Sequence, residues 1–310
     1  MKKVFIDGQA GTTGLQLAQR LAGHGQVEVM AIQPEKRKDE EARQALMNQA
    51  DVVFLCLPDQ AAREAVELIH NPHTVVIDTS TAHRVNPGWA YGFSELSPVH
   101  TQKIAQGQRI ANPGCHATGF IAAAYPLVKL GLVPADYPFS CHSITGYSGG
   151  GRKMIEQYQA PDRPQGLSSP RAYALSLAHK HLPEMQQVPG LTRPPLFEPI
   201  VCDFYCGMEV ALPLRLDLLP GHPTVEQIEE GLCSFYADSP LIQVERPPED
   251  GFLPANLMAG KDGLKLYVTG SGDMALVVSL LDNLGKGAAG AAVQNMNLAL
   301  GFDPLASLRV

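Results

Sequence analysis

The sequence predicts an α/β protein with a Rossmann-type, doubly wound parallel sheet and an α+β domain with a mixed sheet. Three observations support this prediction. A short apolar run at residues 2–7 ends in a glycine-rich turn, apolar runs then alternate with helix-period segments, and strand-type runs dominate the chain after Cys115. Hydrophobic residues make up 45% of the 310 residues, which is enough for a substantial core in one large domain or two.

Composition excludes several classes of protein. The net charge of −7 provides no basic field for nucleic acid. The longest apolar runs, such as residues 274–281, are far shorter than a membrane-spanning helix. The N-terminus reaches Asp7 and Gly8 without an apolar signal region, and the six cysteines form no C-x-x-C pair. We therefore expect a reduced, cytoplasmic protein without a metal site.

The first predicted strand, residues 2–7, leads through a turn with the spacing G-x-x-G-x-x-G into a helix-period segment. Strand, glycine turn and helix are the context in which a dinucleotide binds, with its pyrophosphate on backbone N–H groups at the helix start. The alternative is a tight turn that binds no ligand. The residues predicted to bind the cofactor here are Gly8, Gly11, Thr12, Thr13 and Gly14.

A basic run follows the second predicted strand, residues 27–32. An NAD site usually has an acidic residue at this point, whereas this chain continues into Lys36, Arg37 and Lys38. Cations suit the 2′-phosphate of NADP, so we predict NADP (NADPH) as the cofactor, with Lys36 and Arg37 as ligands. The alternative is a solvated loop.

Two more strands, residues 50–57 and 75–78, continue the alternation, with a helix at 60–69 between them. Ligands of a doubly wound sheet bind at the carboxyl ends of its strands. Pro58 and Ser80 follow these two strands, and we predict that both contact the cofactor. Arg84 is a candidate clamp for an anionic substrate group, and a surface ion pair is the alternative.

The segment Asn112-Pro113-Gly114-Cys115 predicts a turn that leads into a helix. Asn-Pro favours turn initiation, and Gly114 tolerates backbone angles that other residues resist. A cysteine at a helix start lies among unpaired N–H groups at the positive end of the helix dipole, which favours the thiolate. We therefore predict that Cys115 is a nucleophile. A buried structural cysteine is the alternative.

Two later segments carry further candidate residues. A strand at 139–145 runs into a glycine-rich loop, 146–153, whose final cations Arg152 and Lys153 suit an oxyanion such as phosphate; a flexible hairpin loop is the alternative. Next come His179 and His181, followed by Glu184. We interpret them as a histidine acid/base with a nearby carboxylate, because no third ligand stands at a metal-site spacing.

The rest of the chain predicts a mixed sheet with two helices. Residues 158–173 should be irregular because they are rich in Pro, Ser and Gly. The predicted strands are 200–203, 208–216, 265–271 and 275–281, and the predicted helices are 224–237 and 291–300. Small residues before the last helix allow close backbone approach to a cofactor or to another helix.

Five motifs in this order resemble the N-acetyl-gamma-glutamyl-phosphate reductase family in its shorter form, over essentially the whole chain. The cysteine turn and the closing motif are shared with aspartate-semialdehyde dehydrogenases and define the superfamily, whereas His-x-His-x-Pro-Glu is more specific. The motifs are Gly8–Gly14, Asn112–Cys115, Thr145–Arg152, His179–Glu184 and Asp282–Gly290.

The resemblance implies an NADP-binding Rossmann domain of residues 1–116 and 283–310, completed by the C-terminal helix, and a catalytic and dimerisation domain of residues 117–282. It implies NADPH-dependent reduction of N-acetyl-L-glutamyl 5-phosphate to the 5-semialdehyde, through a thioester on Cys115, in arginine biosynthesis. A homodimer or homotetramer is expected. His181 is the first choice for the proton shuttle and His179 the second.

The resemblance also assigns further contacts. Asn283 and Lys286 are expected to contact the cofactor. The residues expected to hold the substrate or its phosphate are Arg84, Asn112, Ser148, Gly149 and Arg152. Two alternatives stay open for the whole chain: an aspartate-semialdehyde dehydrogenase, and a regulatory protein that senses NADP without catalysis.

Overall fold

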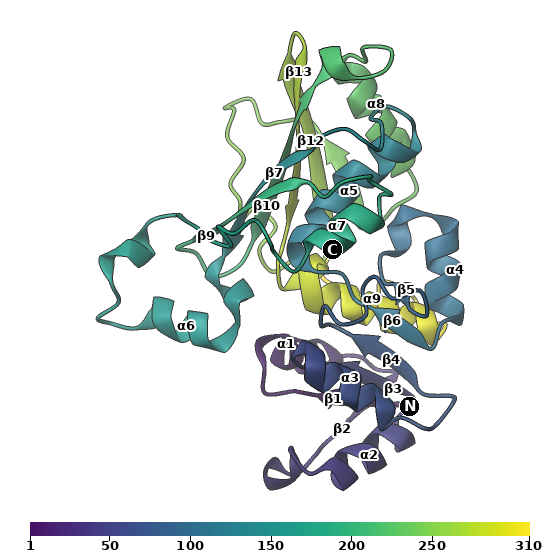
Figure 1. Ribbon diagram of the computed structural model, residues 1–310. Coiled ribbons are helices and arrows are strands. Elements are labelled where there is room, and N and C mark those ends of the chain that lie inside the picture. Colours follow the sequence, from purple (N-terminus) through teal and green to yellow (C-terminus); the bar gives the residue numbers. More distant parts are fainter. The chain divides into compact units, whose positions relative to one another are not determined.

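The computed structural model describes residues 1–310, and the chain divides into two compact units (Figure 1). The first unit comprises Met1–Gly114 and Ala288–Leu308, and the second comprises Cys115–Gly287 and Arg309–Val310. Not one helix in either unit combines the length and the apolar character needed to cross a membrane.

A six-stranded parallel sheet in the order β2-β1-β3-β4-β6-β5 forms the centre of the first unit. The strand order reverses between β1 and β3, so the carboxyl ends of these strands form a topological switch point. The elements are β1 (Lys2–Asp7), α1 (Thr12–Leu21), β2 (Val27–Met30), α2 (Glu40–Gln49), β3 (Val52–Leu55), α3 (Asp59–Glu67), β4 (Val75–Asp78), β5 (Ala90–Tyr91), α4 (Pro98–Gln106), β6 (Arg109–Ala111) and α9 (Gly290–Ala299).

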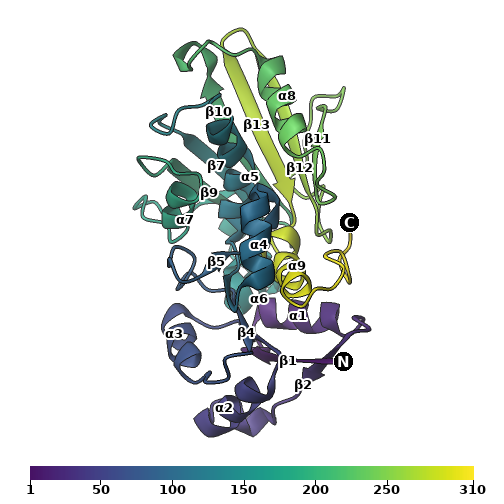
Figure 2. The same ribbon diagram turned by 90° about the vertical axis from the view of Figure 1, so that its right-hand side faces the viewer.

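Helices cover both faces of this sheet, which confirms the predicted doubly wound fold. Successive residues of a strand point to opposite faces. Val4 of β1 accordingly packs in one apolar cluster with residues of α1 and α9, whereas Phe5 packs in a second cluster with residues of α2 and α3. The C-terminal helix α9 packs against α1 and α4 (Figure 2).

Helices α2 and α4 were not predicted from the sequence. Helix α2 buries only Met47, so it lacks the apolar stripe by which a helix is recognised. Its start is instead marked by Asp39, whose side chain accepts a hydrogen bond from Ala42 N at 2.8 Å. Helix α4 begins in the same way, because Ser97 caps the N–H of His100.

The second unit is built on a seven-stranded mixed sheet in the order β11-β12-β13-β10-β7-β9-β8, as predicted. Helix α5 packs on β10 and β13, and α8 packs on β12 (Figure 2). The elements are α5 (Cys115–Lys129), β7 (Ser140–Gly146), α6 (Gly151–Gln159), β8 (Arg171–Ala172), α7 (Leu182–Gln187), β9 (Leu196–Cys202), β10 (Met208–Arg215), α8 (Val225–Phe235), β11 (Ile242–Glu245), β12 (Leu264–Ser271) and β13 (Met274–Leu281).

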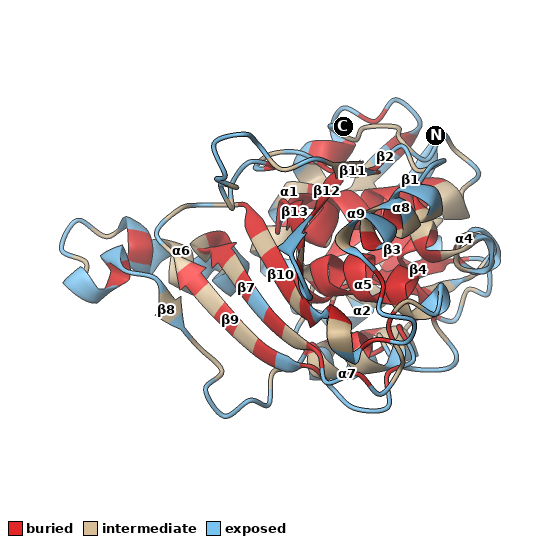
Figure 3. Cartoon of the chain, turned by 90° about the horizontal axis from the view of Figure 1, so that it is seen from above, coloured by how far each residue is buried: buried red, intermediate tan, exposed pale blue.

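Helix α5 is the central helix of this unit and is buried over almost its entire length after Cys115 (Figure 3). Its small residues allow this burial: Gly119 lies so close to β10 that an added Cβ would be 2.4 Å from a methyl carbon of Val210. The helix start is therefore held in a fixed position by packing on the sheet.

The prediction of a loop at residues 146–153 was wrong. Tyr147–Gly150 form a 3₁₀ turn, and α6 begins at Gly151, whose φ is +74°. The glycines suggested a loop, but Arg152, Lys153 and the residues after them are good helix formers.

Candidate active site

The glycine turn between β1 and α1 is tightly packed. Gly8 has a φ of +84°, and a Cβ there would be 2.3 Å from the carbonyl oxygen of Cys56. A Cβ at Gly14 would be 2.6 Å from Gly8 O, whereas one at Gly11 would meet nothing closer than 3.4 Å. Gly8 and Gly14 are thus required by close approach, and Gly11 is not.

The start of α1 has the features of an anion site. Gly11 is the N-cap residue and supplies no side-chain cap, and the half-buried Thr12 and Thr13 are the first two residues of the helix. The first N–H groups of such a helix can bind a phosphate. The turn therefore fits the pyrophosphate of a nicotinamide dinucleotide at the switch point of the sheet.

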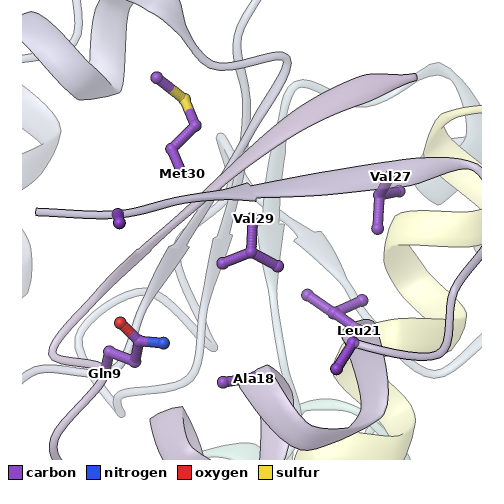
Figure 4. A pocket seen from close by; sticks show the side chains of 8 residues that line it. Gln9, Ala18, Leu21, Val27, Val29 and Met30 are labelled. Carbon is purple, nitrogen blue, oxygen red and sulfur yellow. The ribbon is translucent and has the colours of Figure 1, made fainter.

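A hollow of about 340 Å³ lies beside this turn, between α1 and β2 (Figure 4). Gln9 is its only polar lining side chain, so the hollow offers no cation to a phosphate. The other lining residues are Ala18, Leu21, Ala22, Val27, Val29, Met30 and Ala31.

The basic residues after β2 are exposed. Lys36 ends a short 3₁₀ turn, and Arg37 follows it. A further arginine, Arg43 of α2, forms an ion pair of 2.7 Å with the buried carboxylate of Asp7 at the end of β1. Asp7 thus offsets the charge of Arg43, and the exposed positive charge comes from Lys36, Arg37 and Lys38. The Asp7–Arg43 pair was not predicted, because α2 was not predicted.

Asp78, at the carboxyl end of β4, organises the segment that follows it. Its buried carboxylate accepts a 2.7 Å hydrogen bond from the hydroxyl of Ser80 and lies 2.7 Å from His83 Nδ1. The ring of His83 stacks on Trp89 with centroids 4.0 Å apart. Ser80 is therefore held in place by Asp78, whereas Pro58 is exposed at the N-cap of α3.

Arg84 and Asn112 fix the chain just before Cys115. The guanidinium of Arg84 donates to the carbonyl oxygens of Asn112 and Thr79, both at 3.0 Å. The amide of Asn112 donates to Ala288 O and accepts from Asn295, again at 3.0 Å. Both residues thus stabilise backbone within the first unit, a role that the sequence did not indicate.

Cys115 is the first residue of α5 and is partly exposed, as expected for a nucleophile at a helix start. A Cβ on Gly287 would lie 2.8 Å from Cys115 Cβ, so only glycine permits this approach. Gly287 was missed as a site residue. Its spacing in the closing motif, Gly285-Lys286-Gly287, was the available signal.

Four aromatic rings gather around His116, the residue after Cys115. Its ring centroid lies 5.6 Å from that of His179, 5.7 Å from that of His181 and 5.2 Å from that of Phe197. The Tyr173 hydroxyl is 2.7 Å from His116 Nε2. The structure thus places both predicted histidines close to the start of α5.

Burial lowers the pKa of His116 to about 3, and the positive charge of His179 contributes. His116 is consequently an uncharged ring at neutral pH. His179 Nδ1 accepts a 3.1 Å hydrogen bond from the backbone N–H of His181, which leaves Nε2 as the other site for its ring proton. His181 is buried at the N-cap of α7, and the buried Glu184 lies in the first turn of that helix.

A second group of predicted residues comes together around Asn283. Its amide nitrogen donates to Ser148 Oγ at 2.9 Å, and its amide oxygen accepts from Gly207 N at 2.9 Å. A Cβ on Gly149 would be 3.4 Å from the same amide nitrogen. Lys286 is buried in the π-helical turn Gly285–Ala289, whose residues precede α9.

Arg152 is not grouped with these side chains. It is 79% exposed and pairs with Glu156 one turn further along α6, at 2.7 Å. Exposed pairs of this kind contribute little to stability, so Arg152 can exchange this partner for another anion at little cost.

Two family descriptions match the chain. Residues 3–104 match the semialdehyde dehydrogenase NAD binding domain, and residues 115–283 match the semialdehyde dehydrogenase dimerisation domain. The N-acetyl-gamma-glutamyl-phosphate reductases of Brucella ovis and Brucella abortus are each 48% identical to it over 307 residues, which are 96% of this chain and 99% of theirs.

Solved structures show the same fold at low identity. Aspartate semialdehyde dehydrogenase II of Vibrio cholerae superposes with a TM-score of 0.70 at 15% identity, covering 97% of this chain and 98% of that one. The aspartate semialdehyde dehydrogenase of Francisella tularensis gives 0.72 at 14% identity, over 96% and 99% of the two chains. These likenesses establish the fold alone.

Proposed function

Because the chain belongs to the N-acetyl-gamma-glutamyl-phosphate reductase family, we propose that it reduces N-acetyl-L-glutamyl 5-phosphate to N-acetyl-L-glutamate 5-semialdehyde and phosphate in arginine biosynthesis. The observation that carries this proposal is Cys115 at the start of α5, against the backbone of Gly287 and beside a cluster of histidines. A thiol in this position is suited to acyl transfer.

The Cys115 thiolate attacks the acyl carbon of the substrate, and phosphate leaves, so that a thioester forms. The nicotinamide cofactor supplies the hydride for the reduction of this thioester. Cysteine is needed because a thioester accepts hydride more readily than an oxygen ester does. Backbone N–H groups in the first turn of α5 stabilise the negative oxygen that develops, an effect of about 3 kcal/mol per donor in other acyl-transfer enzymes.

Proton transfer in this reaction is assigned to the histidines. His181 takes the proton of the Cys115 thiol and returns one to the developing alkoxide, with His179 as the second choice. Both rings lie within 6 Å of His116, the neighbour of Cys115, when ring centroids are compared. Glu184, in the first turn of α7, orients the histidine that acts.

The remaining assignments concern binding. We propose NADP as the cofactor, since Lys36 and Arg37 are exposed cations after β2. The first unit holds the dinucleotide through its glycine turn, whereas the second binds the acyl phosphate and carries the contacts of a homodimer or homotetramer. The matching description as a dimerisation domain supports this last assignment.

A reverse-direction assay tests the reaction. Purified protein is mixed with N-acetyl-glutamate 5-semialdehyde, phosphate and NADP⁺, and the absorbance of NADPH is followed. We expect a signal that requires phosphate and is absent when aspartate semialdehyde replaces the substrate. A signal with aspartate semialdehyde alone would contradict the proposed substrate and would still support the proposed reaction type. No signal with either aldehyde, despite NADP⁺ binding, would favour the alternative of a regulatory protein that senses NADP without catalysis.

A further inference from the structure

The turn that packs against Cys115 is held by Asp282, a residue that no step proposed above uses. Asp282 follows β13 and is 2% exposed. Its backbone oxygen accepts hydrogen bonds from the N–H groups of Gly285 and Gly287, at 3.0 and 2.9 Å. Its carboxylate oxygen Oδ1 accepts from the N–H of Leu284 at 2.9 Å. Asp282 therefore fixes the turn that brings Gly287 to Cys115.

A second segment of the same unit, residues 260–262, packs on this turn. The other carboxylate oxygen of Asp282, Oδ2, accepts a 2.6 Å hydrogen bond from the N–H of Gly260. A Cβ on Gly285 would be 2.0 Å from the carbonyl oxygen of Lys261, so only glycine permits this approach. The carboxylate of Asp282 thus joins the turn to the segment, because each of its oxygens accepts from a different one of the two.

Asp262 lies at the end of this segment and is fully buried. Its N–H donates to Arg309 O at 2.7 Å, and its carboxylate oxygen Oδ2 accepts from Arg309 N at 2.9 Å. Both bonds use the backbone of Arg309, an exposed residue that belongs to the second unit. The other carboxylate oxygen of Asp262 would be 3.0 Å from a Cβ on Gly285. Asp262 therefore lies between Arg309 and the turn.

We propose that Asp282 and Asp262 are positioning residues for Cys115, which they hold in place through Gly287, and that the backbone of Arg309 supports Asp262. This inference rests on the proposed function of Cys115 as a nucleophile and deepens it. A Cβ on Gly287 would be 2.8 Å from Cys115 Cβ and 3.2 Å from Cys115 Cα, so the turn restricts the cysteine on that side. Neither carboxylate exchanges a proton in the reaction.

Alkylation of Cys115 by iodoacetamide, measured on the full chain without substrate, tests the proposal independently of turnover. The rate constant is taken at the high-pH plateau, where the thiol is fully ionised, so it reports access to the sulfur. In Asp282→Asn, one of the two N–H groups at the carboxylate loses its acceptor, because an amide has a single oxygen. We expect the plateau to rise about fivefold, the factor that corresponds to one lost hydrogen bond.

Cys141 is the internal control for this measurement. It is 1% exposed on β7 of the same unit, so it should stay unmodified in peptide maps of every variant if the unit remains closed. Modification of Cys141 at the same rate as Cys115 would show that the whole unit opens, and the positioning role would then be rejected.

Arg309→Pro and Arg309→Ala form a matched pair. Proline removes the N–H that donates to Asp262, whereas alanine keeps both backbone groups and removes only an exposed side chain. Arg309→Pro should therefore raise the plateau for Cys115, as should Asp262→Ala, and Arg309→Ala should keep the wild-type value.

A wild-type plateau in Asp282→Asn would overturn the proposal. A raised plateau there, with wild-type values in Asp262→Ala and Arg309→Pro, would overturn the roles of Asp262 and Arg309. If a carboxylate variant does not fold, the two Arg309 variants decide the point, and equal plateaus in them would contradict the proposal.

Kinetics in the reverse direction separate this inference from the proposed function. Asp282→Asn should lower kcat roughly 10- to 100-fold with an unchanged KM for the semialdehyde, because a misplacement of about 1 Å can cost this much. Arg309→Pro should lower kcat less, and a wild-type kcat in both variants would reject the positioning role. Absence of turnover in the wild type, together with raised alkylation plateaus in the variants, would reject the proposed reaction and retain the role of Asp282.

Discussion

We propose that two helices of this protein begin at functional sites, and their N-termini differ in the groups that they present. Helix α1 offers only backbone: its N-cap is Gly11, and no side chain caps it. Helix α5 begins with the thiol of Cys115 and continues with the buried ring of His116. We therefore expect the same dipole and unpaired N–H groups to bind the anion of a ligand at α1 and to favour the thiolate of Cys115 at α5.

The two helix starts also differ in the residues that pack around them. The α1 turn depends on close backbone contacts among Gly8, Gly14 and Cys56, which follow the adjacent parallel strands β1 and β3 of one sheet. The α5 start depends on Ser143, Tyr173 and Gly287, which come from β7, from the segment after β8 and from the turn before α9. The backbone turn is therefore held by one neighbouring strand end, whereas the reactive side chain has neighbours from three separate segments of the second unit.

The largest expected effect is at the α5 start. Cys115→Ser should reduce turnover by roughly 1000-fold or more, because the oxygen nucleophile forms an ester that accepts hydride poorly. NADPH affinity, measured by fluorescence titration, should stay at the wild-type value, since α1 is untouched. Substantial turnover in this variant would show that Cys115 is not the nucleophile. The contrast between the two helix starts would then not hold.

The next effect concerns the α1 turn. Gly14→Ser places a Cβ 2.6 Å from Gly8 O and should lower the free energy of unfolding by about 1–3 kcal/mol. Gly11→Ser is the matched control, because its Cβ would meet nothing closer than 3.4 Å and serine is a good N-cap. Denaturant unfolding measures both. Equal losses in the two variants would show that packing does not distinguish these glycines.

A smaller effect is expected from the basic residues after β2. Arg37→Ala should weaken NADP⁺ binding about tenfold through loss of a charged contact to the 2′-phosphate. Isothermal titration with NAD⁺, which lacks this phosphate, is the internal control and should give the same affinity in both proteins. An equal loss for both dinucleotides would assign Arg37 to structure rather than to cofactor choice.

A further effect concerns pH. The pKa of His116 is about 3 in the folded protein, below the ordinary histidine value, so between these values the unfolded chain binds the extra proton. Stability should therefore fall as pH drops below about 6.5, by up to roughly 1 kcal/mol per pH unit. His116→Gln should show a shallower decline in urea unfolding between pH 6.5 and 4.5, and an equal slope would contradict the buried neutral ring.

Cysteine reactivity follows from the same contrast in environment. Burial raises the pKa of Cys56 to about 12 and raises that of Cys141 as well. Neither should react with iodoacetamide at pH 7.5, whereas Cys115 at its helix start should, as peptide mapping of the alkylated protein will show. Alkylation of Cys141 at the same rate would indicate that the second unit opens readily.

The sequence by itself determined the fold class, the glycine turn and the cysteine at a helix start. These features are encoded over short stretches: periodicity distinguishes strands from helices, and the residues of a turn are neighbours in the chain. The sequence did not predict α2, because this helix has almost no apolar face. It also did not predict α6, because the glycines at the start of this helix suggested a loop.

Only the tertiary structure decided which side chains surround Cys115. His116 meets Ser143 and Tyr173 across 27 and 57 residues of chain, and Asn283 meets Ser148 across 135. No local pattern encodes these pairs, because strand order and sheet register bring them together. The chain sequence thus specifies the proposed nucleophile and its helix, whereas the folded sheet supplies the hydrogen bonds of the buried ring beside it.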